Sequence, residues 1–170
     1  MQTLVVGDVH GCAKELFELL KKTHFSPDRD RLLLTGDAFS RGPDPLGVWH
    51  LIDEYGAEMV LGNHDARLRQ QLDNLSEDGS PGRIKPDQRF TLHALESIHS
   101  TLRTWLHQVP LYIEEDRFLL VHAGINPERG LAETSFEEFI TIRIWPPVKG
   151  SIDGPRWHEV YEPLHPLLIF

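Results

Sequence analysis

The sequence predicts an α/β fold, because strand-like and helix-like segments alternate along its first part. An apolar run over residues 2–6 ends at Gly7-Asp8, and the pattern of an amphipathic helix follows over residues 12–22. The same succession of strand, Gly-containing turn and helix occurs twice more before the middle of the chain. Strands that alternate with helices pair in parallel, with the helices on the faces of the sheet. We therefore expect a parallel sheet built from βα units.

The second and third units follow the same plan. Residues 32–34 form the second strand, which ends in a Gly-Asp pair, and a helix is expected over residues 44–55. Residues 57–61 form the third strand, which ends in the turn Gly62-Asn63-His64-Asp65. A helix is expected from about Ala66.

A second helical region and a β-hairpin are expected to follow. Residues 76–87 are rich in Ser, Gly, Pro and charged residues, which indicates an exposed loop, and residues 88–107 carry a long amphipathic pattern. Alternation over residues 111–121 predicts a hairpin whose second strand leads directly into His122. The segment Thr134-Ser135-Phe136-Glu137 has the form of a capping box and predicts a short helix.

The last part of the chain predicts a loop and a final strand. Pro, Gly and Trp residues over 145–157 are typical of a surface loop, whereas residues 166–170 form an apolar run that predicts a buried strand. With 40% hydrophobic residues, the 170-residue chain has enough apolar material for one core. We expect residues 1–170 to form a single domain.

Composition restricts the kinds of function. The formal net charge of −9 argues against sequence-independent binding of nucleic acids, which needs clustered Lys and Arg. The negative charge does not exclude a phosphorylated substrate, because bound divalent ions reverse the local field that an anion meets. The single cysteine, Cys12, excludes an internal disulfide, and the first apolar run is too short for a signal or a membrane span. We expect a cytoplasmic protein without a membrane anchor.

Side chains that can bind metals follow the strands. The turns carry Asp8 and His10, then Asp37, then Asn63 and His64. Because the carboxyl ends of strands in an open α/β sheet line one crevice, we expect these side chains to converge. A pair of divalent ions about 3.5–4 Å apart needs a bridging carboxylate and further oxygen and nitrogen ligands. Asp37 is the natural bridge. Asp8 and His10 would complete the ligands of one ion. Asn63 and His122 would be ligands of the other.

Any one of these turns, taken alone, is also compatible with an ordinary βα loop and a capping Asp. Four segments together resemble the calcineurin-like metallophosphoesterases in order, spacing and residue type, over residues 2–127. They are Gly7-Asp8-Val9-His10-Gly11, Gly36-Asp37 with Arg41-Gly42, Gly62-Asn63-His64-Asp65 and Val121-His122-Ala123-Gly124. The resemblance implies a β-sandwich flanked by helices. It also implies hydrolysis of a phosphoester or phosphoanhydride by a hydroxide bound to a two-metal site, in line with the leaving group.

Carried over residue by residue, the resemblance implies two metal sites that share one ligand. The first is formed by Asp8, His10 and Asp37, and the second by Asp37, Asn63 and His122. His64 would be the general acid near the leaving oxygen, and Arg41 would hold the phosphoryl oxygens. Asp65 would either orient His64 or favour the start of the following helix. The expected ions are Mn²⁺, with Fe, Co, Ni, Zn or Mg as alternatives.

Two departures indicate the subfamily. Protein Ser/Thr phosphatases carry Asp where this chain has Ser40, and Arg where it has Leu61. Symmetrical diadenosine tetraphosphatases resemble this chain at both positions and in the run Arg41-Gly42-Pro43. The resemblance therefore favours a hydrolase of dinucleoside polyphosphates. A Ser/Thr-type protein phosphatase and a non-catalytic metal-binding module are the alternatives.

A third departure concerns the end of the chain. The family pattern closes its second metal site with a histidine in a Gly-His pair after a buried strand, and then adds further strands. Residues 166–170 resemble that strand, and the pair does not follow. The resemblance thus implies a C-terminally incomplete domain that lacks one ligand. His158 or His165 would either substitute for it or, as the sequence favours, cap a surface loop.

Overall fold

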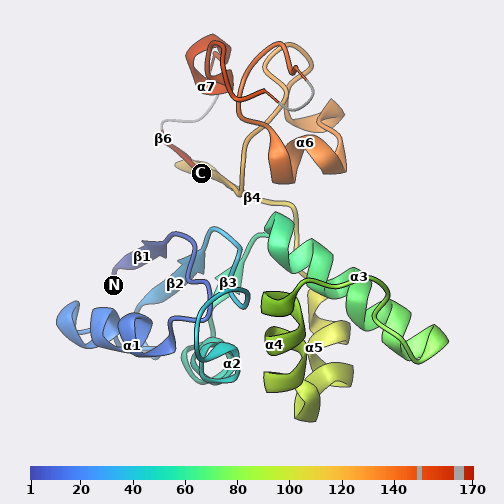
Figure 1. Ribbon diagram of the computed structural model, residues 1–170. Helices are drawn as coiled ribbons and strands as arrows, with labels where there is room; N and C mark the ends of the chain where they lie inside the picture. Colours follow the sequence, from blue (N-terminus) through green and yellow to red (C-terminus); the bar gives the residue numbers. More distant parts are fainter. Residues whose placement is uncertain (149–150, 163–166) are drawn as a thin grey trace.

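Two three-stranded sheets form the centre of the molecule in the computed structural model, which describes residues 1–148, 151–162 and 167–170 (Figure 1). The first sheet has the order β1-β2-β3 and is parallel throughout. The second has the order β4-β5-β6, with β5 antiparallel to β4 and parallel to β6. The strands are β1 (Thr3–Val6), β2 (Arg31–Leu34), β3 (Glu58–Met59), β4 (Tyr112–Glu115), β5 (Phe118–Val121) and β6 (Leu167–Ile169).

Helices flank both sheets. Figure 1 shows α1 and α2 beside the first sheet, α6 and α7 beyond the second, and α3, α4 and α5 grouped at one side. Their bounds are α1 (Ala13–Lys22), α2 (Pro45–Tyr55), α3 (Asn63–Asp78), α4 (Pro86–Ala94), α5 (His99–Leu106), α6 (Phe136–Thr141) and α7 (Trp157–Val160). Among the described residues, none of these helices has the length and apolar character needed to cross a membrane.

Successive side chains of the strands point alternately into different layers of the molecule. Leu33 of β2 and Val60, which follows β3, pack against Leu120 of β5 between the two sheets. The neighbours of Leu33 point the opposite way, into the core that the first sheet forms with α1 to α5. Leu119 and Val121 likewise point into a second core with α6 and α7. This period of two confirms the predicted α/β fold, a β-sandwich flanked by helices.

The predicted helix over residues 88–107 is wrong in one respect, because the chain forms two helices there. A 3₁₀ turn at Glu96–Ile98 separates α4 from α5. Leu95 and Leu102, on either side of the break, are both fully buried. An amphipathic pattern continues across such a break when both helices bury the same side, so periodicity alone does not reveal it.

Several predicted boundaries also need correction. The third strand is only Glu58–Met59, and α3 begins at Asn63 rather than at Ala66, so the turn residues themselves open the helix. The capping box is shifted by one residue from the predicted position. Ser135 is the N-cap of α6, and its hydroxyl accepts from the Glu138 N–H while the Glu138 carboxylate accepts from the Ser135 N–H.

The C-terminal segment differs most from expectation. The predicted loop over 145–157 ends in the first residue of α7, Trp157, whose side chain is buried in the second core. The predicted final strand forms β6, yet Leu167 is 55% exposed and Phe170 is 50% exposed. This strand covers the edge of β5, and its Leu168 and Ile169 are partly buried against the second core and the layer between the sheets. Residues 149–150 of the predicted loop, Pro166 and His165 lie outside the described residues.

Candidate two-metal site

The three turns at the carboxyl ends of the first sheet lie against one another. Asp8 and His10 follow β1, Asp37 follows β2, and Asn63 opens α3. The His10 N–H donates to the Asp37 carbonyl oxygen at 2.9 Å and ties the first turn to the second. His10 and Asp37 both have left-handed backbone conformations, with φ of 47° and 53°. Such conformations are costly for residues with a side chain and are concentrated at functional sites.

Two glycines allow the second turn to reach the start of α3. Gly36 has a φ of +100°, and a Cβ there would lie 2.6 Å from the backbone nitrogen of Gly62. A Cβ on Gly62 would lie 2.2 Å from Oδ1 of Asp37 and 2.4 Å from its backbone nitrogen. The absence of both Cβ atoms therefore lets the Asp37 turn and the start of α3 touch backbone to backbone.

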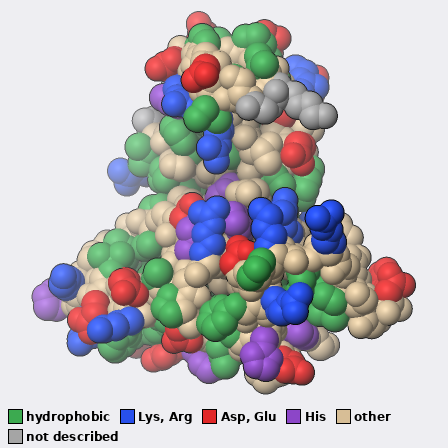
Figure 2. Space-filling model, viewed as in Figure 1, with side chains coloured by type: hydrophobic (Ala, Val, Ile, Leu, Met, Phe, Trp, Pro, Cys, Tyr) green, Lys and Arg blue, Asp and Glu red, His purple; other side chains and the backbone are tan. Residues whose placement is uncertain are grey.

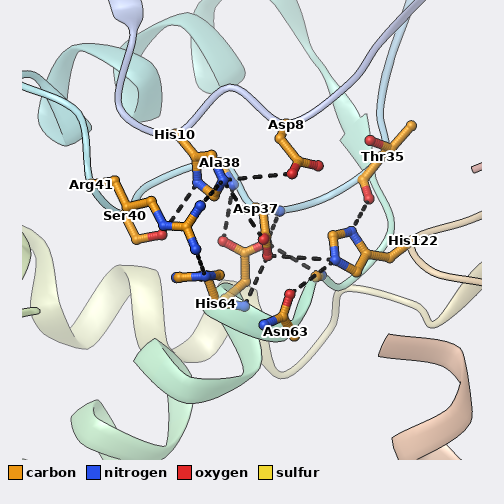
Figure 3. Close-up of polar contacts among 12 residues, drawn as sticks. Asp8, His10, Thr35, Asp37, Ala38, Ser40, Arg41, Asn63, His64 and His122 are labelled. Atoms are coloured by element: carbon orange, nitrogen blue, oxygen red, sulfur yellow. Dashed lines mark hydrogen bonds and ion pairs between the residues drawn. The ribbon is translucent and has the colours of Figure 1, made fainter. Parts of the chain in front are cut away.

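Asp8, His10 and Asp37 form the first cluster of candidate ligands (Figure 3). Each offers one ligand atom, and these atoms lie within 4.8 Å of one another. His10 Nε2 lies 3.5 Å from Asp8 Oδ2 and 4.0 Å from Asp37 Oδ2. Arg41 Nη1 also donates to His10 Nε2 at 3.3 Å, and a guanidinium only donates. Nε2 is therefore the unprotonated nitrogen, directed at two carboxylates.

Asp37, Asn63 and His122 form the second cluster. His122 Nδ1 lies 2.8 Å from the Thr35 carbonyl oxygen, which only accepts, so Nδ1 carries the proton. In the neutral ring Nε2 is then an acceptor. It lies 3.2 Å from Asn63 Oδ1 and 3.8 Å from Asp37 Oδ1. Figure 3 shows these groups directed toward one another.

The geometry of the second cluster fits a cation. Three acceptor atoms, one nitrogen and two oxygens, face one another, and such atoms repel unless a positive charge lies between them. Carboxylate, imidazole and amide oxygen donors suit borderline and hard divalent ions. The Thr35 carbonyl fixes the His122 ring in the tautomer that metal binding needs, in the way that outer hydrogen bonds commonly orient metal-binding histidines. The Asp37 carboxylate belongs to both clusters, as a bridging ligand requires.

His64 and Arg41 lie on the same edge. Arg41 Nη2 donates to His64 Nε2 at 2.8 Å, and the ring centroids of His10 and His64 are 5.2 Å apart. Burial lowers the pKa of His64, the Asp37 carboxylate acts in the opposite direction, and the nearby Arg41 guanidinium lowers it further. The guanidinium thus connects a candidate metal ligand with the predicted general acid.

Comparison with known proteins fits this geometry. A family model described as calcineurin-like phosphoesterase matches residues 1–161. The chain belongs to this family. The predicted family is thereby confirmed, and the group of Asp8, His10 and Asp37, from the first two turns, is a possible metal-binding group in agreement with it.

Two relatives are named "Bis(5'-nucleosyl)-tetraphosphatase, symmetrical". The protein from Salmonella paratyphi C (strain RKS4594) is 39% identical over 132 residues, which make up 75% of this chain and 45% of the relative. The protein from Actinobacillus pleuropneumoniae serotype 3 (strain JL03) is 40% identical over 139 residues, or 79% of this chain and 49% of the relative. This chain spans about half the length of the curated relatives it matches.

A solved structure shows the same relationship. The crystal structure of a protein provisionally described as a diadenosine tetraphosphatase superposes on this phosphoesterase with a TM-score of 0.78 and 28% sequence identity. The match covers 97% of this chain and 72% of that one. The similarity therefore extends over both sheets and the site between them.

Asp65 of the phosphoesterase lies beneath the site rather than in it. Its carboxylate is almost fully buried and accepts from the N–H groups of Asp37 at 2.6 Å, Ala38 at 3.1 Å and Gly62 at 3.3 Å. Burial and the Asp37 carboxylate raise the pKa of Asp65 to about 7, against the opposing effect of these donors. All the hydrogen bonds described for this carboxylate go to backbone rather than to the His64 ring. Of the two roles predicted for Asp65, these hydrogen bonds match the one at the start of α3. They also hold the backbone of the Asp37 turn.

Of the side chains that residues 140–158 contribute to the site, sequence reasoning named only His158 and missed the two arginines. A cavity of about 440 Å³ joins Asp8, Asn63 and His122 to Arg143, Arg156, Trp157 and His158. Arg143 precedes the isolated bridge residue Ile144, and Arg156 is the bridge partner of Ile144. The two guanidinium groups belong to a segment without any recognisable turn motif, so only their positions in space indicate a role. Ser40, which the sequence marked only as a departure, lies 3.4 Å from His10 Nδ1 through its hydroxyl oxygen.

Proposed function

We propose that this phosphoesterase hydrolyses a phosphoanhydride bond of a dinucleoside polyphosphate at a site that holds two divalent ions. One observation carries the proposal. The buried carboxylate of Asp37 belongs to two clusters in which acceptor atoms face one another, one with His10 and one with His122. Bound ions would supply Lewis acidity, activation of water and neutralisation of phosphoryl charge.

The described residues divide these tasks. Asp8, His10 and Asp37 would hold one ion, and Asp37, Asn63 and His122 the other, with Mn²⁺ as the proposed metal. Arg41 can present two N–H groups to phosphoryl oxygens in place of the two imidazole nitrogens that it contacts now. We assign His64 the role of general acid, because its ring lies at the same edge of the first sheet as the candidate ligand His10, with ring centroids 5.2 Å apart.

Asp65 is proposed as a positioning residue. It holds the backbone of Asp37 and Ala38 from below and does not face the site. The left-handed turn at Asp37 needs such support, because its own conformation is unfavourable.

Several features support a dinucleoside substrate. Two relatives that are 39% and 40% identical to this chain carry the name of symmetrical tetraphosphatases. Leu61 is fully buried, so the residue that replaces a phosphate-binding Arg of protein phosphatases is a core residue here. Arg143 and Arg156 supply cations on the wall opposite Asp8, where a chain of phosphates would need them. A nucleotide substrate and a single cysteine also fit a cytoplasmic enzyme.

The test is hydrolysis of diadenosine tetraphosphate by the Mn²⁺-loaded protein, with products separated by anion exchange. We expect ADP as the only nucleotide product and loss of the activity in Asp37→Asn. Asp53→Asn, an exposed change of the same kind on α2, serves as control. Hydrolysis of a phosphopeptide without hydrolysis of diadenosine tetraphosphate would favour a protein phosphatase. Stoichiometric Mn²⁺ binding without any turnover would favour a non-catalytic module.

A further inference from the structure

A second, smaller cavity adjoins the site on the side of His64. Its volume is about 210 Å³, and it shares Arg41, Asn63 and His64 with the site. Its remaining walls are formed by Arg67, Lys85, Asp87 and Gln88. We call it the α3/α4 cavity. Asn63 lines both this cavity and the 440 Å³ cavity.

Two helices begin at the α3/α4 cavity. Asn63 is the first residue of α3, which has 16 residues, and Lys85 is the N-cap of α4, which has 9. The positive ends of two helix dipoles therefore converge on one small space. Backbone N–H groups and the dipole at a helix start favour anions, phosphate groups in particular.

The charged side chains of the α3/α4 cavity are also mainly positive, like the helix starts. Arg41, Arg67 and Lys85 contribute three cations and Asp87 one carboxylate, in a chain whose formal net charge is −9. Arg67 and Lys85 are exposed, and no ion pair is found for either among residues 1–148, 151–162 and 167–170. Figure 2 shows Lys and Arg side chains gathered near exposed His side chains where the two halves of the molecule meet. Cations without carboxylate partners at two helix starts are suited to a ligand with several negative charges.

We propose that Arg67 and Lys85 bind the phosphoryl groups on the His64 side of the scissile bond and thereby select a polyphosphate chain over a simple phosphomonoester. The inference rests on the proposed function, since it assigns one arm of the substrate at the same site. Cleavage in the middle of a tetraphosphate leaves two phosphoryl groups on each side. The α3/α4 cavity takes one pair, and the cavity with Arg143 and Arg156 takes the other.

Asp87 makes the proposal sharper, because it is the one carboxylate among the residues that line the α3/α4 cavity. Its negative charge in the first turn of α4 opposes an anionic ligand. Removing this charge should strengthen binding, whereas removing the charges of Arg67 and Lys85 should weaken it. Arg89 offers a matched control, because it is an exposed cation on α4 and does not line the cavity.

The experiment measures binding of inorganic triphosphate and of orthophosphate by calorimetry, with divalent ions removed by a chelator, so that hydrolysis does not contribute to the measured heat. For the double variant Arg67→Gln/Lys85→Gln we expect about tenfold weaker binding of triphosphate and a much smaller effect on orthophosphate. Asp87→Asn should bind triphosphate about twofold to threefold more tightly. Arg89→Gln should bind as the unmodified protein does, and circular dichroism checks that each variant is folded.

Kinetics with the Mn²⁺-loaded protein separate this inference from the proposed function. The double variant should lose kcat/KM on diadenosine tetraphosphate, mainly through KM, by a larger factor than on p-nitrophenyl phosphate. If the unmodified protein hydrolyses neither substrate, the proposed function fails, and triphosphate binding still decides the inference. Unchanged triphosphate affinity in the double variant, or equal losses for triphosphate and orthophosphate, would overturn it.

Discussion

The two halves of the protein build the same candidate site by different means. Residues 1–110 contribute Asp8, His10, Asp37 and Asn63 from consecutive turns of one parallel sheet, each a few residues long. The second half contributes one candidate ligand, His122, directly after β5, and most of its other residues at the site lie between 140 and 158. Short turns bring ligands together through strand order alone, whereas the second half depends on how a longer irregular segment packs.

The junction between the halves is narrow. Leu33, Val60 and Leu120 are its fully buried apolar side chains, and Arg31 adds ion pairs to Glu58 within the first sheet and to Glu115 of the second. His122 reaches the first half through its hydrogen bond to the Thr35 carbonyl. Small changes in sheet packing should therefore act on the second cluster of candidate ligands before the first.

The largest effect is expected for Asp37→Asn, which weakens the bridge within the first half. The amide keeps the size of the side chain but removes the negative charge that both clusters share. We expect loss of activity by at least about 10²-fold and weaker Mn²⁺ binding, measured by phosphate release and by metal titration. Comparable activity and metal content in Asp37→Asn and in the control Asp53→Asn would contradict the bridging role.

Leu120→Ala tests the junction. The side chain is fully buried between the sheets, so truncation should lower the free energy of unfolding by about 3 kcal/mol, measured by urea denaturation. It should also weaken binding of one of two Mn²⁺ ions, because His122 follows two residues later. The control Leu19→Ala removes a side chain that is 37% exposed and should change stability by about 0.5 kcal/mol. A stability loss without any change in metal binding would show that the junction does not position His122.

Arg143→Gln tests the wall of the second half. The guanidinium lines the larger cavity together with Asp8 and His122. We expect kcat/KM on diadenosine tetraphosphate to fall about tenfold while Mn²⁺ binding stays as before, since the residue would contact substrate rather than metal. Arg117→Gln, at the exposed turn between β4 and β5, is the matched control. An equal fall in both variants would point to overall charge rather than to the cavity.

The smallest effect is expected far from the site, in the first half. Asp73 of α3 accepts from Arg103 Nε at 2.6 Å and lies 2.9 Å from His107 Nε2, so it joins α3 to α5. Burial alone would raise the pKa of Asp73, but these partners outweigh it and lower the pKa. The stabilisation is therefore present above the ordinary carboxyl pKa and is lost as the pH falls through the folded value.

Asp73→Asn should accordingly lower the free energy of unfolding by about 1 kcal/mol at pH 7 and by less below about pH 4. Denaturant unfolding at several pH values measures the difference. Asp78→Asn, an exposed change near the end of the same helix, should show no such loss. A pH-independent difference for Asp73→Asn would mean that packing, rather than charge, joins the two helices.

The chain pattern by itself determined the three βα units, the hairpin that leads into His122 and the candidate ligands at the strand ends. It could do so because each signal is local: a period of two or of 3.6 residues, a Gly beside an Asp, a polar residue directly after an apolar run. Periodicity did not reveal the break between α4 and α5, because Leu95 and Leu102 both face the core. It also left two roles open for Asp65, whose partners Asp37 and Ala38 are 28 and 27 residues away in sequence.

Only the tertiary structure decided which groups surround the two clusters of candidate ligands. Thr35, which fixes the tautomer of His122, is 87 residues away from it, and Arg143 and Arg156 reach the site from a segment without a motif. The α3/α4 cavity likewise exists only because two helices start side by side. Local patterns specify where a strand or helix begins and ends, whereas the field and shape of a site depend on packing between distant segments, which no short stretch of sequence encodes.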